Sequence, residues 1–228
     1  MSHERPIMLV DDDPSLLEAL PQLLQRRLPH VPIEVVSSAS AALAQLAMRR
    51  YGVIMSDVRM PVMDGWQLLQ TVTTRYPDTP VLLLSGYLDP PGVLNALRAG
   101  AYDVILKPLS PTFLAERIRQ ALIIHRCMRR IKARQLLIAR GRRQIVVMQQ
   151  ILDNAQGRAV PIQNSTLARR SVAPRHLKRM TVTELKASLD RLKGRIHFLE
   201  AKTNGSAADI QSAYAQARLF ARQRAAGL

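Results

Sequence analysis

The sequence predicts an α/β fold, a doubly wound five-stranded parallel sheet, followed by an all-α, partly coiled-coil C-terminal region. In residues 1–125, short apolar runs alternate five times with helix-like segments, which is the pattern of a parallel sheet covered on both faces. Beyond residue 125, the apolar residues follow helical spacing only. The charge changes at the same point, because residues 1–125 hold 11 Lys/Arg and 12 Asp/Glu, whereas residues 126–228 hold 22 and 5.

The five expected strands are apolar runs bounded by polar or turn residues. The third run, "YGVIMSD", is of the buried type and ends on Asp57. Such runs, each separated from the next by a helix, favour parallel pairing. The expected strands are residues 6–10, 33–37, 51–57, 80–86 and 102–108.

A helix is expected after each strand. The first has leucines at helical spacing, with Asp13 placed to cap it and Pro14 suited to its first turn. The second is expected to begin at Ser40, and Gly100 is a stop signal for the fourth. The expected helices are residues 14–28, 40–50, 65–76, 91–100 and 111–124.

The C-terminal region is expected to contain long helices. No linker follows the fifth helix, which continues through residues 126–157 as a connecting helix. Its apolar residues recur every seven positions, as in a coiled coil, but the companion positions are mostly polar and Gly141 is expected to interrupt it. The repeat consists of Ile124, Ile131, Ile138, Ile145 and Leu152.

A second amphipathic helix is expected from Val182, with Asn204-Gly205 closing it and a final helix starting at Ser206. Its apolar stripe is shorter than three heptads. The stripe therefore suits pairing with the first long helix, pairing with a partner chain, or a simple bundle core.

Composition indicates a cytoplasmic protein. Cys127 is the only cysteine, so an internal disulfide is impossible and a reducing compartment is expected. The N-terminal apolar run is too short for a signal peptide, and no run approaches the roughly 18 apolar residues of a membrane span.

Polar residues end four of the expected strands. Asp11 and Asp12 end the first, Asp57 the third, Ser85 the fourth and Lys107 the fifth. Carboxyl ends of parallel strands meet at one edge, so these side chains are expected to converge there. Three carboxylates repel one another unless a cation lies among them, and Mg²⁺ prefers such oxygen ligands. A carboxylate in this setting is a nucleophile toward phosphorus, for which the lysine and the serine provide a charge and a hydrogen bond. The bond from the lysine to Pro108 is a candidate cis peptide.

Residues 1–125 resemble the receiver domain of bacterial two-component response regulators, a flavodoxin-like and CheY-like fold. The resemblance rests on "LVDDDPSLLEAL", "SDVRMPVMDG", "VLLLSGY" and "AGAYDVILKP". It implies that Asp57 accepts a phosphoryl group from a histidine kinase or a phosphotransfer protein, without true enzymatic activity beyond possible autodephosphorylation. It also implies that Asp11, Asp12, Asp57 and the backbone carbonyl of Arg59 hold Mg²⁺, with Ser85 as the switch hydroxyl and Lys107 as the phosphoryl-binding lysine. Asp13 is expected to cap the helix.

One position departs from the receiver pattern. Receiver domains usually have Phe or Tyr three residues before the lysine, whereas this chain has Val104. Tyr102 is expected on the same strand face by alternation. The conformational readout of phosphorylation is therefore expected to differ. Arg59 and Tyr87 flank the site and are candidates for controlling the approach of water.

Two interpretations of the basic region, residues 158–228, remain open. It is expected either to bind DNA as the output of a transcriptional regulator, or to be a dimerisation and protein-interaction adaptor. A homodimer is expected in both cases. Residues 165–181 weakly resemble a helix-turn-helix whose turn is short by about one residue. The candidate nucleic-acid contacts are Arg169, Arg170, Arg175, His176, Lys178 and Arg179.

Overall fold

The computed structural model describes residues 5–87, 90–157 and 180–226, with side chains described up to residue 205 except at residue 90. The strands are β1 (Ile7–Val10), β2 (Ile33–Val36), β3 (Val53–Asp57), β4 (Val81–Ser85) and β5 (Asp103–Leu106). The helices are α1 (Pro14–Gln25), α2 (Ala39–Met48), α3 (Gly65–Arg75), α4 (Pro90–Arg98), α5 (Pro111–Ala155) and α6 (Val182–Ala226).

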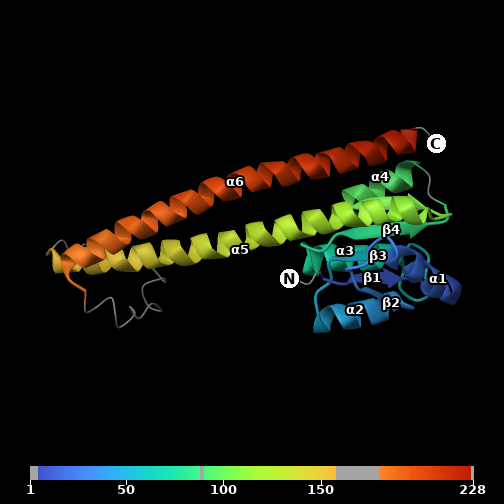
Figure 1. The fold of residues 1–228 in the computed structure, drawn as a ribbon, viewed down its shortest axis with the longest axis horizontal. Coiled ribbons are helices and arrows are strands. Elements are labelled where there is room, and N and C mark those ends of the chain that lie inside the picture. Colours follow the sequence, from blue (N-terminus) through green and yellow to red (C-terminus); the bar gives the residue numbers. More distant parts are fainter. Residues whose placement is uncertain (1–4, 88–89, 158–179, 227–228) are drawn as a thin grey trace. The chain divides into compact units, whose positions relative to one another are not determined.

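The five strands form one parallel sheet in the order β2-β1-β3-β4-β5 (Figure 1). This confirms the predicted doubly wound fold. The strand order reverses between β1 and β3, and ligands of open α/β sheets bind at the carboxyl ends of the strands beside such a reversal. The topology therefore predicts that the ligand site includes residues that follow β1 and β3.

Side chains that alternate along each strand build two apolar layers. On β1, Met8 and Val10 pack with residues of α2, α3 and α4, whereas Ile7 and Leu9 pack with residues of α1 and the first turns of α5. All four are fully buried. Both faces of the sheet are therefore covered, as the apolar runs in the sequence indicate.

Helix starts in this part of the chain are set by capping side chains. The carboxylate of Asp13 accepts a hydrogen bond from the backbone N–H of Ser15 at 2.9 Å, as predicted for the cap of α1. Helix α2, however, begins at Ala39, and its cap is Ser38, whose hydroxyl accepts from Ala41 N at 3.2 Å. The predicted start at Ser40 is therefore wrong by one residue, because the preceding serine makes the capping bond.

Tyr102 and Val104 do not share a face of the sheet, contrary to the prediction. Val104 packs in the layer with α3 and α4, whereas Tyr102 packs in the layer with α5. Tyr102 lies just before β5, so the two-residue alternation of strand side chains does not extend to it.

The chain separates into two units. Unit 1 comprises Met1–Arg129 with Asp209–Leu228, and unit 2 comprises Arg130–Ala208. Helix α5 is continuous from Pro111 to Ala155, in agreement with the predicted absence of a linker. No helix in the described part of the chain is both long and apolar enough to cross a membrane.

Unit 2 is an antiparallel pair of helices. Met148 and Leu152 of α5 pack against Leu185 and Leu189 of α6, and all four side chains are buried. Arg142 of α5 pairs with Glu200 of α6 at 2.6 Å, at the other end of the pair. The apolar stripe of α6 therefore packs against α5, the first of the three arrangements that the sequence allows.

Two glycines of unit 2, Gly141 and Gly205, do not end their helices, contrary to prediction. Gly141 is buried in α5, and a Cβ there would collide with the Cδ1 of Ile196, so its small size permits close packing. Helix α6 also continues through Asn204 and Gly205, and no separate helix starts at Ser206. A glycine costs an α-helix about 1 kcal/mol, which long helical flanks on both sides outweigh.

Candidate functional site

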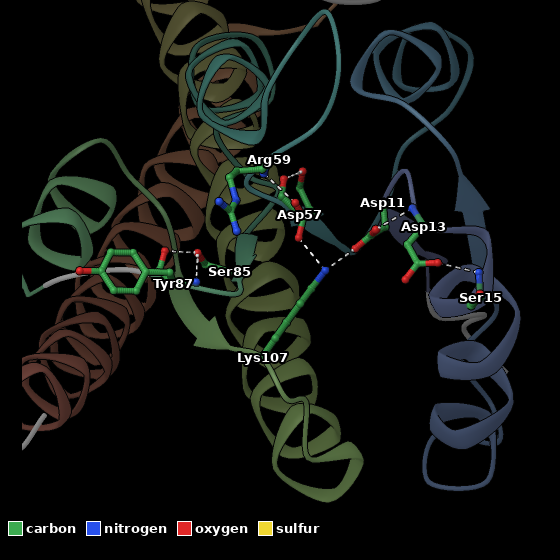
Figure 2. A network of polar contacts seen from close by, with 9 residues as sticks. Asp11, Asp13, Ser15, Asp57, Arg59, Ser85, Tyr87 and Lys107 are labelled. Atoms are coloured by element: carbon green, nitrogen blue, oxygen red, sulfur yellow. Dashed lines mark hydrogen bonds and ion pairs between the residues drawn. The ribbon is translucent and has the colours of Figure 1, made fainter.

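Three residues from different strands meet at the carboxyl edge of the sheet (Figure 2). The ammonium group of Lys107 lies 2.9 Å from Oδ2 of Asp11 and 2.7 Å from Oδ1 of Asp57. Both carboxylates are buried, with exposed fractions of 1% for Asp11 and 7% for Asp57. The structure therefore brings together two predicted acids and the predicted lysine.

The backbone around Asp57 fixes its carboxylate. Its Oδ2 accepts a hydrogen bond from the backbone N–H of Arg59 at 2.6 Å, which leaves Oδ1 directed to Lys107. Helix α3 starts very close to this segment: the N–H of Gly65 donates to the carbonyl of Val58 at 2.9 Å, and a Cβ on Gly65 would collide with the carbonyl oxygen of Asp57. The glycine of "MDG" thus has a structural role in the site that the sequence analysis did not assign.

The acids after β1 have different roles. Asp11 is buried, and its Oδ1 accepts from the N–H of Asp13 at 2.9 Å, while the carboxylate of Asp13 caps α1. Asp12 is exposed. Within the described residues, no three acidic, histidine or cysteine side chains lie close enough to form a metal site by themselves. Asp11 and Asp57 nevertheless present carboxylate oxygens on either side of the ammonium group of Lys107. Hard oxygen donors of this kind are the ligands that Mg²⁺ prefers.

Lys107 is held in its charged form. Partial burial lowers the pKa of its ammonium group, but the hydrogen bonds and charges of Asp57 and Asp11 outweigh that effect and raise the pKa above its usual value. Its backbone N–H donates to the carbonyl of Ser85 at 2.7 Å, which aligns the ends of β5 and β4. The peptide bond between Lys107 and Pro108 is cis, as the sequence suggested.

Ser85 lies at the end of β4, but its hydroxyl is turned toward the following turn. The Oγ donates to the carbonyl of Tyr87 at 2.7 Å and accepts from the N–H of Tyr87 at 3.3 Å. The ring of Tyr87 is 77% exposed and points away from Asp57 in Figure 2. The guanidinium of Arg59 extends toward the same turn, where a Cβ on Gly86 would lie 3.7 Å from it. Arg59 therefore extends beside the site, whereas the ring of Tyr87 points away from it.

Val104 is buried, with an exposed fraction of 7%, and packs among the apolar residues of the α3 and α4 layer. It presents no ring that could move between a buried and an exposed position. The candidate nucleic-acid contacts Arg169, Arg170, Arg175, His176, Lys178 and Arg179 lie outside the described residues.

One buried histidine of unit 1 lies outside the site. His125 is 2% exposed, and its Nδ1 lies 2.6 Å from the carbonyl of Asp78, whereas Nε2 has no hydrogen-bond partner among the described residues. Burial lowers the pKa of the imidazole; the charges of Arg5 and Arg129 lower it further, and the bond to Asp78 opposes them.

Comparison with protein families gives a match for the first half of the chain. Residues 7–119 match the family model described as the response regulator receiver domain. The chain is 37% identical over 121 residues to the C4-dicarboxylate transport transcriptional regulatory protein DctD of Rhizobium meliloti, covering 53% of this chain and 26% of the relative. It is 42% identical over 110 residues to the response regulator protein FleR of Pseudomonas aeruginosa, covering 48% and 23%. The chain thus spans about a quarter of the length of these two relatives.

Solved structures give the same result. The signal receiver domain of an HD domain-containing protein from Pseudomonas fluorescens Pf-5 matches with a TM-score of 0.50 and 33% identity, covering 54% of this chain and 98% of that one. A CheY-like response regulator receiver domain protein from Methanospirillum hungatei JF-1 matches with a TM-score of 0.50 and 27% identity, covering 54% and 96%. Each of these two alignments covers nearly all of the solved chain and only about half of this chain.

Proposed function

Because residues 7–119 of this chain belong to the response regulator receiver domain family, we propose that the chain receives a phosphoryl group on Asp57 from a histidine kinase or a phosphotransfer protein. The observation that carries this proposal is the position of the Asp57 carboxylate, 2.7 Å from the ammonium group of Lys107 at the carboxyl edge of the sheet. The nucleophilic oxygen of Asp57 thus lies next to the fixed positive charge of Lys107.

The reaction follows from this arrangement. An oxygen of Asp57 attacks the phosphorus, a P–O bond forms, and the P–N bond of a phosphohistidine breaks. The electron pair goes to the imidazole nitrogen, which takes up a proton from water. Lys107 neutralises charge on the phosphoryl oxygens, and its raised pKa keeps it protonated for that purpose. Ser85 donates to a phosphoryl oxygen once its hydroxyl leaves the carbonyl of Tyr87.

We propose that Asp11, Asp12, Asp57 and the backbone carbonyl of Arg59 would hold Mg²⁺, because oxygen donors are the ligands that this ion prefers. When bound, the ion supplies positive charge that offsets the repulsion between the carboxylates and the incoming phosphoryl group. Asp13 remains outside this set, since its carboxylate caps α1.

The readout of phosphorylation differs from that of receivers with an aromatic ring at position 104. Val104 is small and buried, so the response has to run through the segment that Ser85 releases. In this proposal the chain is a phosphoacceptor rather than an enzyme, and any loss of the phosphoryl group to water takes place at the same site.

We further propose that the basic C-terminal half is an output that binds DNA as a homodimer. The support is the surplus of Lys and Arg in residues 126–228, together with the relatives whose printed names describe transcriptional regulation. The six candidate contacts between Arg169 and Arg179 are the residues assigned to this role.

A protein-interaction adaptor is the second candidate, and exposed apolar side chains in unit 2 favour it. Leu136, Leu137 and Phe198 are 66%, 56% and 59% exposed. Exposed apolar side chains suit a protein partner better than a phosphate backbone.

Phosphorylation is tested by incubating the full chain with acetyl phosphate and Mg²⁺ and measuring the intact mass. One phosphoryl group is expected on the wild type and on Asp13→Asn, a matched control that keeps a capping side chain, and none on Asp57→Asn. Equal labelling of wild type and Asp57→Asn would contradict the assignment.

The output is tested with the full chain and sheared genomic DNA in the presence of heparin and random competitor, sequencing whatever stays bound. A shared site that is lost when Arg169, Arg170 and Arg175 are changed to Gln supports the DNA-binding output. Uniform or absent retention in both phosphorylation states favours the adaptor.

A further inference from the structure

We propose that unit 1 binds a small organic anion with a short alkyl body, such as a medium-chain carboxylate, in a pocket between the segment after α1 and the outer side of α5. The pocket has a volume of about 290 Å³. Its walls are residues 27–31 on one side and Arg119, Leu122, Ile123 and Arg126 of α5 on the other. This inference does not depend on the proposed phosphorylation.

The charge of the pocket suits an anion. Arg27, Arg119, Arg126 and His30 line it, and none of the described residues that line it is acidic. Arg119 already pairs with Glu116 at 2.5 Å, so it contributes little free charge.

Arg27 provides the positively charged group that is fixed in place. Its Nε donates to the hydroxyl of Thr112 at 3.2 Å, and its Nη1 donates to the carbonyl of Leu23 at 3.0 Å. Both acceptors are neutral, so the hydrogen bonds orient the guanidinium without neutralising its charge. A planar guanidinium held in this way suits a carboxylate.

The remainder of the wall is apolar. Leu28, Val31 and Leu122 are buried at 4%, 5% and 4% exposure, whereas Ile123 is 50% exposed. An alkyl chain placed on these side chains would cover Ile123 and lose its own contact with water. Inorganic phosphate has no such apolar part, and therefore the ligand class is a carboxylate with a short apolar body.

The pocket lies at the end of the sheet opposite the phosphoacceptor. Residues 27–31 lead into the amino end of β2, and Leu122 packs so closely on Gly52, just before β3, that a Cβ there would lie 2.7 Å from it. Asp57 is the last residue of β3. A ligand in the pocket therefore leaves the phosphoacceptor accessible.

The test uses the ¹⁵N-labelled full chain, titrated with butanoate, hexanoate and inorganic phosphate at constant ionic strength and followed by NMR. Hexanoate is expected to shift the amide signals of residues 27, 28, 30 and 31 and of residues 119–126. It should bind about tenfold more tightly than butanoate, because two further methylene groups are buried. Asp57→Asn should leave this binding unchanged.

Variants separate the pocket from general attraction of anions. Arg27→Gln is expected to weaken hexanoate binding about tenfold, whereas Arg26→Gln, a matched change at the adjacent exposed arginine, should leave it unchanged. Ile123→Ser should reduce the difference between hexanoate and butanoate, and its exposed position keeps the fold intact. The proposal is overturned if the two carboxylates bind equally, if phosphate binds as tightly as hexanoate, or if Arg26→Gln and Arg27→Gln have the same effect.

Discussion

The buried ion pair between α5 and β5 gives a quantitative prediction about the stability of unit 1. Nε of Arg117 lies 2.6 Å from Oδ2 of Asp103, and the two side chains are 8% and 5% exposed. Oδ1 of Asp103 accepts from the backbone N–H of Val104 at 2.9 Å, and the guanidinium lies 5.5 Å from the ring centre of Tyr102. We consider the change Arg117→Met, which keeps most of the aliphatic volume.

The expected loss comes mainly from the carboxylate that remains. Arg117→Met leaves Asp103 buried with one backbone hydrogen bond and no compensating charge, a situation that costs about 3–5 kcal/mol. Loss of the contact between the guanidinium and the ring of Tyr102 adds about 0.5–2 kcal/mol. Since domains of this kind are stable by only about 5–15 kcal/mol, the variant is expected to be close to unfolding at room temperature.

The chain provides its own control and its own probe. Arg119→Met removes an arginine two residues away on the same helix, but its pair with Glu116 is 46% and 53% exposed and is worth about 0–1 kcal/mol. The only tryptophan, Trp66, packs at the edge of the core of unit 1. Its fluorescence during urea unfolding therefore reports the stability of that unit for the wild type and both variants.

Equal destabilisation by Arg117→Met and Arg119→Met would refute the reasoning from burial. A second check is the double variant Arg117→Met with Asp103→Asn, which removes both charges. It is expected to be more stable than Arg117→Met alone, because no buried charge remains. Simple additivity of the two single changes would show that the pair is not coupled.

Three further outcomes are expected. Lys107→Met should slow phosphorylation by acetyl phosphate about a hundredfold at a temperature where the variant is still folded, since it removes the charge beside the nucleophile; an unchanged rate would contradict its role. The pKa of His125 is lowered in the folded state, so as pH falls below about 6.5 the imidazole takes up a proton in the unfolded chain before it does so in the folded chain. Stability should therefore decrease as pH falls through that range, and His125→Gln should weaken this dependence in urea titrations at pH 7.5 and 5.5. Gly141→Leu should destabilise unit 2 by about 1–3 kcal/mol, measured by amide hydrogen exchange around Ile196. The control is Gly194→Leu, which should not destabilise unit 2 because a Cβ at Gly194 would meet no other atom within 4 Å.

Strand topology predicts the edge at which the site lies, because the last residues of parallel strands meet there, and Asp11, Asp57 and Lys107 do so. It does not predict the direction of each side chain: Asp12 is exposed, and the hydroxyl of Ser85 bonds to Tyr87. The role of Gly65 was not predictable, because the distance between the start of α3 and the end of β3 is a property of the packed backbone.

The errors in the sequence analysis have a common cause. Local propensity predicts helix ends at Gly141 and Gly205, but packing and long helical flanks outweigh a cost of about 1 kcal/mol. Strand alternation predicts a shared face for Tyr102 and Val104, but Tyr102 lies before the first residue of β5. In each case the surrounding structure, rather than the local rule, decides.

The ion pair between Asp11 and Lys107 joins residues that are 96 positions apart in the chain. A chain that has reached β4 during synthesis contains the nucleophile but neither β5 nor its lysine. The cation beside Asp57 is therefore in place only when the last strand has joined the sheet. Under the proposed function, a chain without β5 is expected to accept a phosphoryl group as slowly as Lys107→Met, so that efficient phosphorylation requires the completed sheet.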